Sequence, residues 1–281
     1  MIRRVDRRAQ WDFCGAFCLL LGLNPLTMHG ARLRVTIGSK YQPGTLTVDV
    51  LTPNVIHSGS HLKVVYVLPV EPLDQHSYGD SLNVIQGLGL QNEYHVIFVA
   101  PTFAQMPWYA DHPSDPLRRQ ESYFLHAVIP LVESRFPVLK EPSGRLLLGF
   151  SKSGWGAFSL LLRHPDVFGA AAAWDAPLDN LTPDAPDGWQ MIDIFGTQEN
   201  FNHYCIFRLL REHGQFVGKN HRFVLLGYGL FKDDVRATHA LMAQLGIPHI
   251  YSNDYWHKHA WDTGWLPQAV SLLLDSDGRK R

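Results

Sequence analysis

Residues 146–156 read LLLGFSKSGWG, and this stretch decides the fold. An apolar run typical of a strand leads into Ser151, and a helical pattern follows at once, which is the layout of a nucleophile elbow. The bend must be sharp to lift the serine hydroxyl above a sheet, so the residues two before and two after it must be small. Gly149 meets this need, and Ser153 stands where the motif usually has glycine. The stretch predicts a catalytic serine at residue 151.

Two other interpretations of the same stretch stay open. A turn built of small residues can also form an anion-binding nest without any catalysis. Ser153 could be the nucleophile instead, but the residue two positions before it is Ser151 rather than a glycine. The sequence therefore favours Ser151 over Ser153.

Outward from this stretch, short apolar runs alternate with segments of helical periodicity, and this alternation predicts a mostly parallel sheet with helices on both faces. Two β-rich runs at residues 33–37 and 45–51 flank a turn at 41–44 and predict an antiparallel hairpin. The other expected strands are 63–68, 94–100, 145–149, 168–174, 222–226 and 249–252, and the expected helices are 121–136, 154–163, 233–245 and 267–274. Residues 177–213 lack clean strand signals and indicate a lid insertion over the carboxyl edge of the sheet.

The composition of the 281 residues fits one α/β domain, expected at residues 32–281. With 25 basic and 26 acidic side chains the net charge is -1, so the electrostatic footprint of a nucleic-acid-binding protein is missing. Hydrophobic residues make up 46% and charged residues 18%, which excludes a disordered chain. Three cysteines cannot form a dense disulfide framework.

Residues 1–31 carry the parts of a secretory signal peptide. Four arginines lie within the first eight residues, residues 13–23 form a nearly unbroken apolar run, and Gly30-Ala31 supplies small residues for cleavage. The apolar run is too short to span a bilayer as a helix. We expect a secreted or periplasmic protein; the alternative is a cytoplasmic protein whose N-terminal helix is docked or disordered.

A histidine near the end of the chain is the expected general base. A serine hydroxyl needs an imidazole to take its proton, and in hydrolases with this elbow the histidine follows the last strand. His259 lies in the segment 256–262, WHKHAWD, between the last expected strand and the last helix. His257 is its near neighbour, and the two could bind a metal, but no cysteine or acidic residue has convincing zinc spacing. We therefore expect no metal site.

Several segments together resemble the esterase D-like family of α/β-hydrolases. The elbow continues through Ala157, and residues 162–168, LRHPDVF, are similar to the family's following helix. Residues 259–261, HAW, match its His-x-Trp motif, and residues 99–101, 108–109 and 129–137 resemble its middle segments. The resemblance covers about residues 33–274. It implies an α/β-hydrolase fold and acyl-ester hydrolysis by a Ser/His/acid triad without a cofactor.

The acid of the triad stays open between two places. Family members usually carry it shortly after the strand at 222–226, but residues 227–232 hold no carboxylate. Asp233 and Asp234 follow, where they could equally cap the next helix. Asp175 stands directly after the preceding strand, and its alternative role is that of a turn residue or a substrate contact.

The remaining site residues are expected from the mechanism. The backbone N–H of Lys152 and one from Val70 or Glu71 would form the oxyanion hole, although Pro69-Val70 replaces the His-Gly of many relatives. Trp108, Tyr109, Trp155 and Trp261 are the candidates for binding substrate, unless these rings fill the core.

Three functions follow from these patterns. The first is a serine carboxylesterase acting on a small-molecule or carbohydrate ester. The second is an acyltransferase using the same triad with a lid that excludes water. The third is a non-catalytic carbohydrate- or protein-binding member of the family. Three departures favour it: the serine at residue 153, the altered oxyanion loop and the unassigned acid. Labelling by a fluorophosphonate separates the first two from the third.

Overall fold

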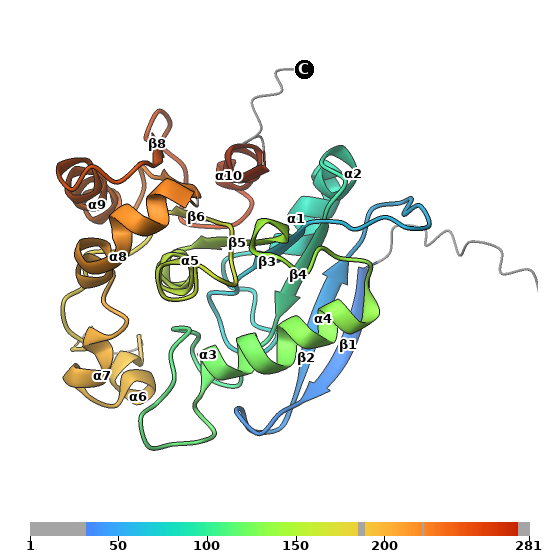
Figure 1. The fold of residues 1–281 in the computed structure, drawn as a ribbon, viewed down its shortest axis with the longest axis horizontal. Helices are drawn as coiled ribbons and strands as arrows, with labels where there is room; N and C mark the ends of the chain where they lie inside the picture. Colours follow the sequence, from blue (N-terminus) through green and yellow to red (C-terminus); the bar gives the residue numbers. More distant parts are fainter. Residues whose placement is uncertain (1–31, 185–188, 221, 275–281) are drawn as a thin grey trace, which may run out of the picture.

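The computed structural model describes residues 32–184, 189–220 and 222–274. These residues build an eight-stranded sheet in the order β1-β2-β4-β3-β5-β6-β7-β8 (Figure 1). The strands are β1 (Arg32–Gly38), β2 (Thr45–Leu51), β3 (Val64–Val67), β4 (Ile97–Pro101), β5 (Arg145–Phe150), β6 (Ala170–Trp174), β7 (Arg222–Leu226) and β8 (Ile250–Ser252).

The predicted hairpin and the mostly parallel sheet are both confirmed. β1 pairs antiparallel with β2, with Val35 opposite Val48, and β2 pairs antiparallel with β4. Every other strand pair is parallel, so β2 is the one described strand that runs against the rest. Parallel strands end at the same edge of a sheet, and this common edge after β3, β5, β6, β7 and β8 gathers the loops that matter for function.

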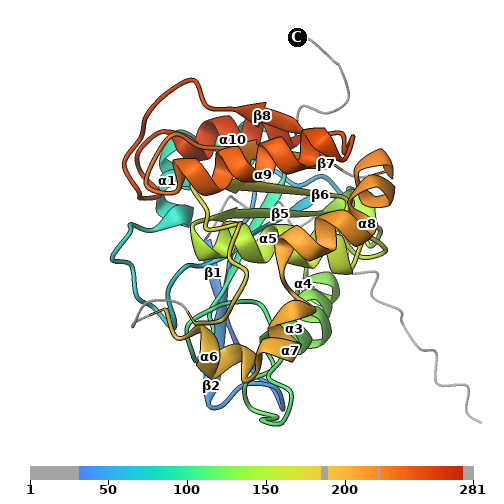
Figure 2. The same ribbon diagram turned by 90° about the vertical axis from the view of Figure 1, so that its left-hand side faces the viewer.

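Helices cover both faces of the sheet. They are α1 (Ser81–Leu88), α2 (Leu90–Glu93), α3 (Gln120–Tyr123), α4 (Ile129–Arg135), α5 (Lys152–Arg163), α6 (Met191–Phe195), α7 (Gln198–Asn202), α8 (Ile206–Asn220), α9 (Lys232–Gln244) and α10 (Trp265–Leu274). A π-helical stretch at Phe124–Val128 joins α3 to α4, and a short 3₁₀ turn covers Pro142–Gly144. In Figure 2, β5 and β6 lie between α10 above and α5 below.

The composition of β6 explains how the two helical layers approach the sheet. Successive side chains of a strand point to opposite faces. Ala171 and Ala173 therefore face the core under α5, while Ala172 and Trp174 belong to the core under α10. The small alanines let both helices pack close to the strand, and the strand reads as an apolar run because it is buried on both faces.

One long helix was not expected from the sequence. α8 packs against α5 and carries buried Ile206, Leu209 and Leu210 on one side. Its sequence includes Gly214, a residue that weakens an isolated helix. A Cβ at this position would lie 2.4 Å from Ile247 Cδ1, so the close packing of α8 against Ile247 requires glycine. Tertiary packing here overrides the local helix preference.

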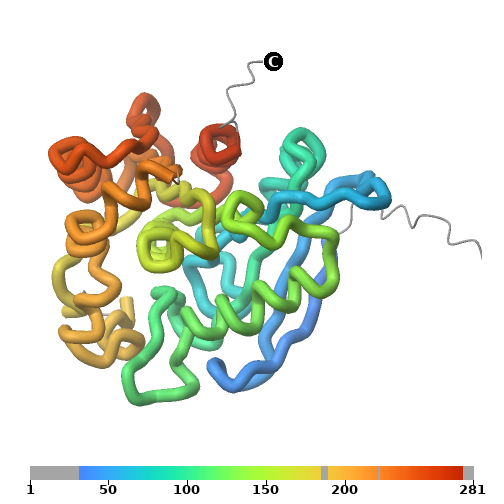
Figure 3. The backbone as a smooth tube through the Cα atoms, in the orientation of Figure 1, coloured from blue at the N-terminus to red at the C-terminus, as the bar shows by residue number. Residues whose placement is uncertain are grey.

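The segment between β6 and β7 contains, in its described part, α6, α7 and the whole of α8 (Figure 3). It includes the insertion expected at residues 177–213, whose role as a lid stays a prediction. The leader expected at residues 1–31 lies outside the described residues. In the described ranges, no helix is long and apolar enough to cross a membrane.

Candidate active site

Ser151 sits on a strained bend between β5 and α5. Its backbone has φ 54° and ψ −136°, a region that residues with a side chain rarely adopt. Gly149 makes the bend possible, because a Cβ there would lie 2.2 Å from the carbonyl oxygen of Ser153. Such strain costs about 1–3 kcal/mol and is typical of functional sites. The elbow expected from residues 146–156 is therefore present in the backbone.

Ser153 has a different place from Ser151. Its side chain is fully buried, and its hydroxyl donates to the Phe150 carbonyl at 2.8 Å and accepts from the Phe150 N–H at 3.0 Å. The serine that replaces the usual glycine thus closes the elbow with two hydrogen bonds. Both of these hydrogen bonds go to Phe150, whereas the hydroxyl in contact with His259 is that of Ser151.

His259 reaches Ser151 from the loop between β8 and α10. Its Nε2 lies 3.1 Å from Ser151 Oγ, which is hydrogen-bond distance. The imidazole packs among aromatic rings, with its centroid 4.7 Å from that of Phe150 and 5.5 Å from that of Tyr78. These rings fix the orientation of the imidazole and shield one side of it from water.

Asp175 holds the other side of the imidazole. It directly follows β6, has φ 42° and is fully buried. Its Oδ2 lies 2.6 Å from His259 Nδ1, and its Oδ1 accepts a hydrogen bond from the Phe231 N–H at 2.7 Å. A carboxylate can only accept, so Nδ1 carries the proton and Nε2 is free to accept the proton of Ser151.

The other two candidate acids have different partners. Asp233 is exposed and pairs with Arg236 at 2.5 Å within the first turn of α9. Burial and the neighbouring carboxyl of Asp179 raise the pKa of Asp234 to about 7. Neither is brought to His259, because the Nδ1 side of the imidazole is occupied by Asp175.

His257 does not join His259 in a metal-binding group. Its ring packs on Trp265 with centroids 4.8 Å apart. In the part of the chain that the structure describes, no three His, Cys, Asp or Glu side chains gather closely enough to hold a metal ion.

The expected oxyanion donors lie on the loop after β3 and at the start of α5. Lys152 is the first residue of α5, so its N–H has no acceptor within the helix. Val70 and Glu71 are both buried, and the Lys152 ammonium donates to the Val70 carbonyl at 3.1 Å. Burial lowers the pKa of Lys152, while the charge of Glu71 acts in the opposite direction. The Lys152 side chain is thus half-buried over the oxyanion loop.

A small cavity of about 120 Å³ opens beside Ser151. Aromatic and apolar side chains dominate its wall. The lining residues are Tyr78, Trp108, Ser151, Lys152, Pro177, Trp189, Leu230, Phe231 and His259. Such an apolar wall with few polar groups is typical of a site that binds a small ligand.

Of the four rings expected to bind substrate, Trp108 lines this cavity and the other three are packed in the core. Trp155 stacks on Phe201, and Trp261 packs on Phe150 with centroids 4.9 Å apart. Tyr109 is fully buried, and its hydroxyl donates to the Pro69 carbonyl at 2.5 Å. Large rings fill cores efficiently, which is why their sequence position near the elbow did not predict exposure.

Sequence reasoning missed Tyr78, Trp189 and Phe231. All three come from irregular segments, where no periodicity marks a side chain that turns inward. The one available signal for Phe231 was its place just before a helix that follows the seventh strand. The conformations of the loops decide whether Tyr78 and Trp189 reach the cavity wall.

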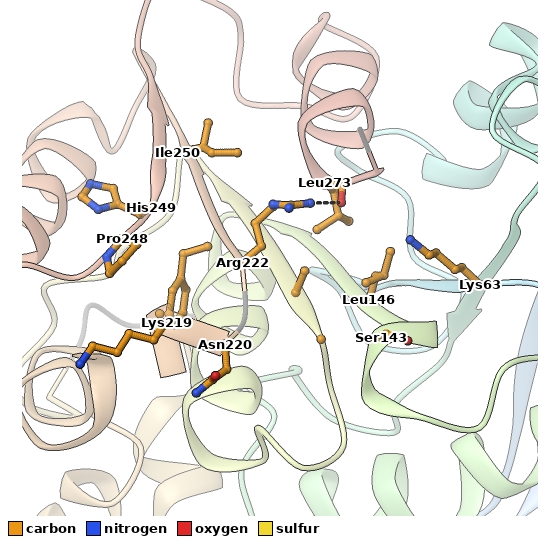
Figure 4. Close-up of a pocket in the computed structure, with 14 residues that line it drawn as sticks. Lys63, Ser143, Leu146, Lys219, Asn220, Arg222, Pro248, His249, Ile250 and Leu273 are labelled. Carbon is orange, nitrogen blue, oxygen red and sulfur yellow. Dashed lines mark hydrogen bonds between the residues drawn. The ribbon is translucent and has the colours of Figure 1, made fainter. Parts of the chain in front are cut away.

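A larger cavity, about 510 Å³, lies at the opposite end of the strands (Figure 4). It is lined by Leu146, Ala170 and Arg222 at the starts of β5, β6 and β7, and Arg222 donates to the Leu273 carbonyl at 3.3 Å. Lys63 and Lys219 bring positive charge to the cavity, and the C-terminal ends of α8 and α10 bring partial negative charge. Ser143 and His249 also line it, but Ser143 Oγ donates to Glu141 and the His249 ring contacts His239, so within the described residues this cavity has no serine–histidine contact like the one at Ser151.

The chain is similar to known proteins in sequence pattern and in fold. A family model described as "Putative esterase" matches residues 39–264. No match was found among curated proteins.

Solved structures share the fold across most of the chain. A ferulic acid esterase has a TM-score of 0.68 and 17% identity, covering 88% of this chain and 98% of its own. The fluorophosphonate-binding serine hydrolase F of Staphylococcus aureus has a TM-score of 0.73 and 16% identity over 88% and 99% of the two chains. The S-formylglutathione hydrolase of Staphylococcus aureus has a TM-score of 0.70 and 16% identity over the same shares. Together with the family match, these similarities show that the chain belongs to the esterase D-like family of α/β-hydrolases.

Proposed function

We propose that the protein is a serine carboxylesterase that hydrolyses its substrate through an acyl-enzyme on Ser151. The observation that carries the proposal is the unbroken series of contacts from Ser151 Oγ through the imidazole of His259 to the buried carboxylate of Asp175. Nucleophile, base and orienting acid in this order are the parts of a serine hydrolase triad. Membership of the esterase family agrees with the proposal.

The acylation step follows from the roles of these groups. Ser151 Oγ attacks the ester carbonyl while His259 Nε2 takes its proton, and the Asp175 carboxylate stabilises the imidazolium that forms. The C–O bond of the ester then breaks, and His259 returns the proton to the departing alkoxide. The alcohol leaves and the acyl group stays on Ser151.

Deacylation repeats the chemistry with water. His259 takes a proton from a water molecule, the hydroxide attacks the acyl carbonyl, and the proton returns to Ser151 Oγ as the carboxylic acid leaves. In both steps the negative oxygen of the tetrahedral intermediate would accept hydrogen bonds from the Lys152 N–H and from Val70 or Glu71. Loss of one such donor typically costs about 3 kcal/mol of barrier.

The proposal extends to an acylated carbohydrate as the substrate. Exposed aromatic side chains on the loops after β7 and β8, namely Tyr228, Tyr255 and Trp256, support it, because aromatic faces can stack on sugar rings. β7 and β8 are parallel neighbours, so both loops leave the sheet at the edge that carries Ser151. Comparing hydrolysis of an acetylated oligosaccharide with that of a simple acetate ester tests this part.

Stopped-flow hydrolysis of p-nitrophenyl acetate tests the esterase itself. We expect a burst of one p-nitrophenol per protein when deacylation is slow, and a fall in kcat of about 10⁶-fold in Ser151→Ala. Ser153→Ala is the matched control and keeps the burst. An inactive wild-type protein would favour the non-catalytic member. Wild-type turnover that survives in Ser151→Ala would move the nucleophile elsewhere, and acyl transfer to an added alcohol in preference to water would identify an acyltransferase.

A further inference from the structure

Two side chains from outside the oxyanion loop hold its carbonyl groups. The loop Pro69–Val70–Glu71 follows β3 and supplies the second oxyanion donor in the proposed mechanism. Tyr109 Oη donates to the Pro69 carbonyl at 2.5 Å, and Lys152 Nζ donates to the Val70 carbonyl at 3.1 Å. Each of the two peptide groups that bear the candidate donors is therefore held from its carbonyl side.

A planar trans peptide couples these contacts to the oxyanion hole. The C=O and the N–H of one peptide unit point in opposite directions and cannot turn independently. The Pro69 carbonyl shares its peptide unit with the Val70 N–H, and the Val70 carbonyl shares its unit with the Glu71 N–H. We propose that Tyr109 and Lys152 are positioning residues, which fix both N–H groups of the oxyanion loop by holding the carbonyls behind them. This inference rests on the proposed esterase function.

Tyr109 has a strained backbone, and the packing of its ring alone does not explain why a tyrosine stands there. Its backbone has φ 56°, a strained conformation for a bulky residue. Its ring leaves no room for a side chain on α5, since a Cβ at Gly156 would lie 2.1 Å from Tyr109 Cδ2. Phenylalanine would fill the same space, so the hydroxyl is the part that acts on the loop. Burial raises the pKa of Tyr109 well above its usual value, which keeps the hydroxyl protonated as a donor.

A buried glutamine fixes the backbone of Tyr109. Gln120 Oε1 accepts hydrogen bonds from the N–H groups of Trp108 at 2.8 Å and Tyr109 at 2.9 Å, and its Nε2 donates to the Met106 carbonyl at 2.8 Å. Gln120 is fully buried. The same glutamine thus sets the position of Trp108 in the cavity wall and of the Tyr109 hydroxyl behind the oxyanion loop.

Lys152 connects the two halves of the oxyanion hole. Its backbone N–H is the expected first donor beside Ser151, and its side chain reaches back to the loop that carries the second donor. A long flexible side chain with a charged donor can make this contact, whereas an apolar side chain of similar length at the same place could not. The residue that follows Ser151 therefore links the two parts of the proposed oxyanion hole.

Kinetics of Tyr109→Phe and Lys152→Met test the proposal, with Tyr123→Phe as the matched control. Tyr123 is also fully buried and packs on Phe103, which packs on Tyr109, but within the described residues the Tyr123 hydroxyl has no hydrogen-bond partner. Each variant is assayed for kcat and KM with p-nitrophenyl acetate and for the Ki of a trifluoromethyl ketone, whose adduct oxygen occupies the hole.

We expect each of the two variants to lose about tenfold or more in kcat, with KM within about twofold of wild type. The ketone should lose affinity by a similar factor, because it resembles the transition state rather than the substrate. The pH profile of kcat/KM should keep its shape, since the positioning of backbone donors changes only the height of the profile. Tyr123→Phe should match wild type in all of these.

The result for each variant decides the role of its own residue. Wild-type kcat and ketone affinity in Tyr109→Phe or in Lys152→Met would overturn the positioning role of that residue. A change in KM alone would instead make it a substrate contact. If Tyr109→Phe does not fold, the proposal is confined to Lys152 and is decided by Lys152→Met, whose side chain is only half-buried. An inactive, unlabelled wild-type protein would refute the esterase proposal, whereas an active wild type with two unaffected variants refutes this inference alone.

Discussion

Asp175 accepts hydrogen bonds on both carboxylate oxygens, from the imidazole of His259 and from the Phe231 N–H. Replacing it by asparagine keeps the size of the side chain but lets an amide face the imidazole, so the tautomer that can accept the proton of Ser151 is lost. We expect Asp175→Asn to lower kcat about 10⁴-fold with p-nitrophenyl acetate. Asp233→Asn, at the exposed alternative position, is the control and should retain full activity. The opposite pattern would assign the acid to α9.

At the residue scale, the sequence predicted the contact between Ser151 and His259, but it left open which carboxylate contacts the imidazole. Ser151 and His259 could be found because each stands in a short motif whose position relative to strands is regular. Asp175 and Asp233 were indistinguishable, since the choice depends on the left-handed backbone of Asp175 and on a donor in a distant loop. Neither of these leaves a mark in the local sequence.

At the element scale, the Asp179–Asp234 pair joins the start of the β6–β7 insertion to α9. Burial and the neighbouring carboxyl of Asp179 raise the pKa of Asp234 to about 7, so the folded protein keeps a proton that the unfolded chain releases near pH 4. Stability from this pair is therefore present below pH 4 and is lost progressively as the pH rises to about 7.

Asp234→Asn removes this pH dependence, because an amide can donate to Asp179 without titrating. We expect the variant to be more stable than wild type at pH 8 by about 1–2 kcal/mol, after allowance for solvent screening, and to differ little at pH 4. Urea unfolding at both pH values measures the difference. Equal stability of the two proteins at pH 8 would contradict the shared proton.

The secondary structure elements themselves were predicted unevenly. The strands of the parallel sheet could be predicted because short apolar, β-branched runs are typical of strands buried on both faces. The burial of β6 on both faces explains its run of alanines. α8 was not predicted because its glycines weaken the local helix pattern. These glycines are needed for close packing against Ile247, and that contact cannot be inferred from local helix preference.

At the scale of the whole molecule, the described fold begins at Arg32 with the edge strand β1, directly after the expected cleavage site. Arg32 and Arg34 both bind the buried carboxylate of Asp49, at 2.7 Å in each case, so this edge is tied to the sheet. A chain that starts at residue 32 should therefore keep the melting temperature and the esterase activity of the full chain. A truncated chain that fails to fold would show that residues 1–31 belong to the folded domain. N-terminal sequencing of protein recovered from the periplasm or the culture medium tests the predicted export and cleavage near Ala31.

The overall architecture could be predicted because strand and helix alternation leaves few topologies. The cavity wall could not, because Tyr78, Trp189 and Phe231 are brought together by loops from three parts of the chain. Substrate preference depends on that wall.

Intact-mass analysis after reaction with a fluorophosphonate tests the central claim most directly, since an activated serine displaces fluoride from the probe and becomes phosphonylated. We predict one adduct per wild-type chain, located by peptide mapping at Ser151, no adduct in Ser151→Ala, and strongly slowed labelling in His259→Ala. Labelling that persists in Ser151→Ala, or a wild-type protein that takes up no probe, would contradict the account.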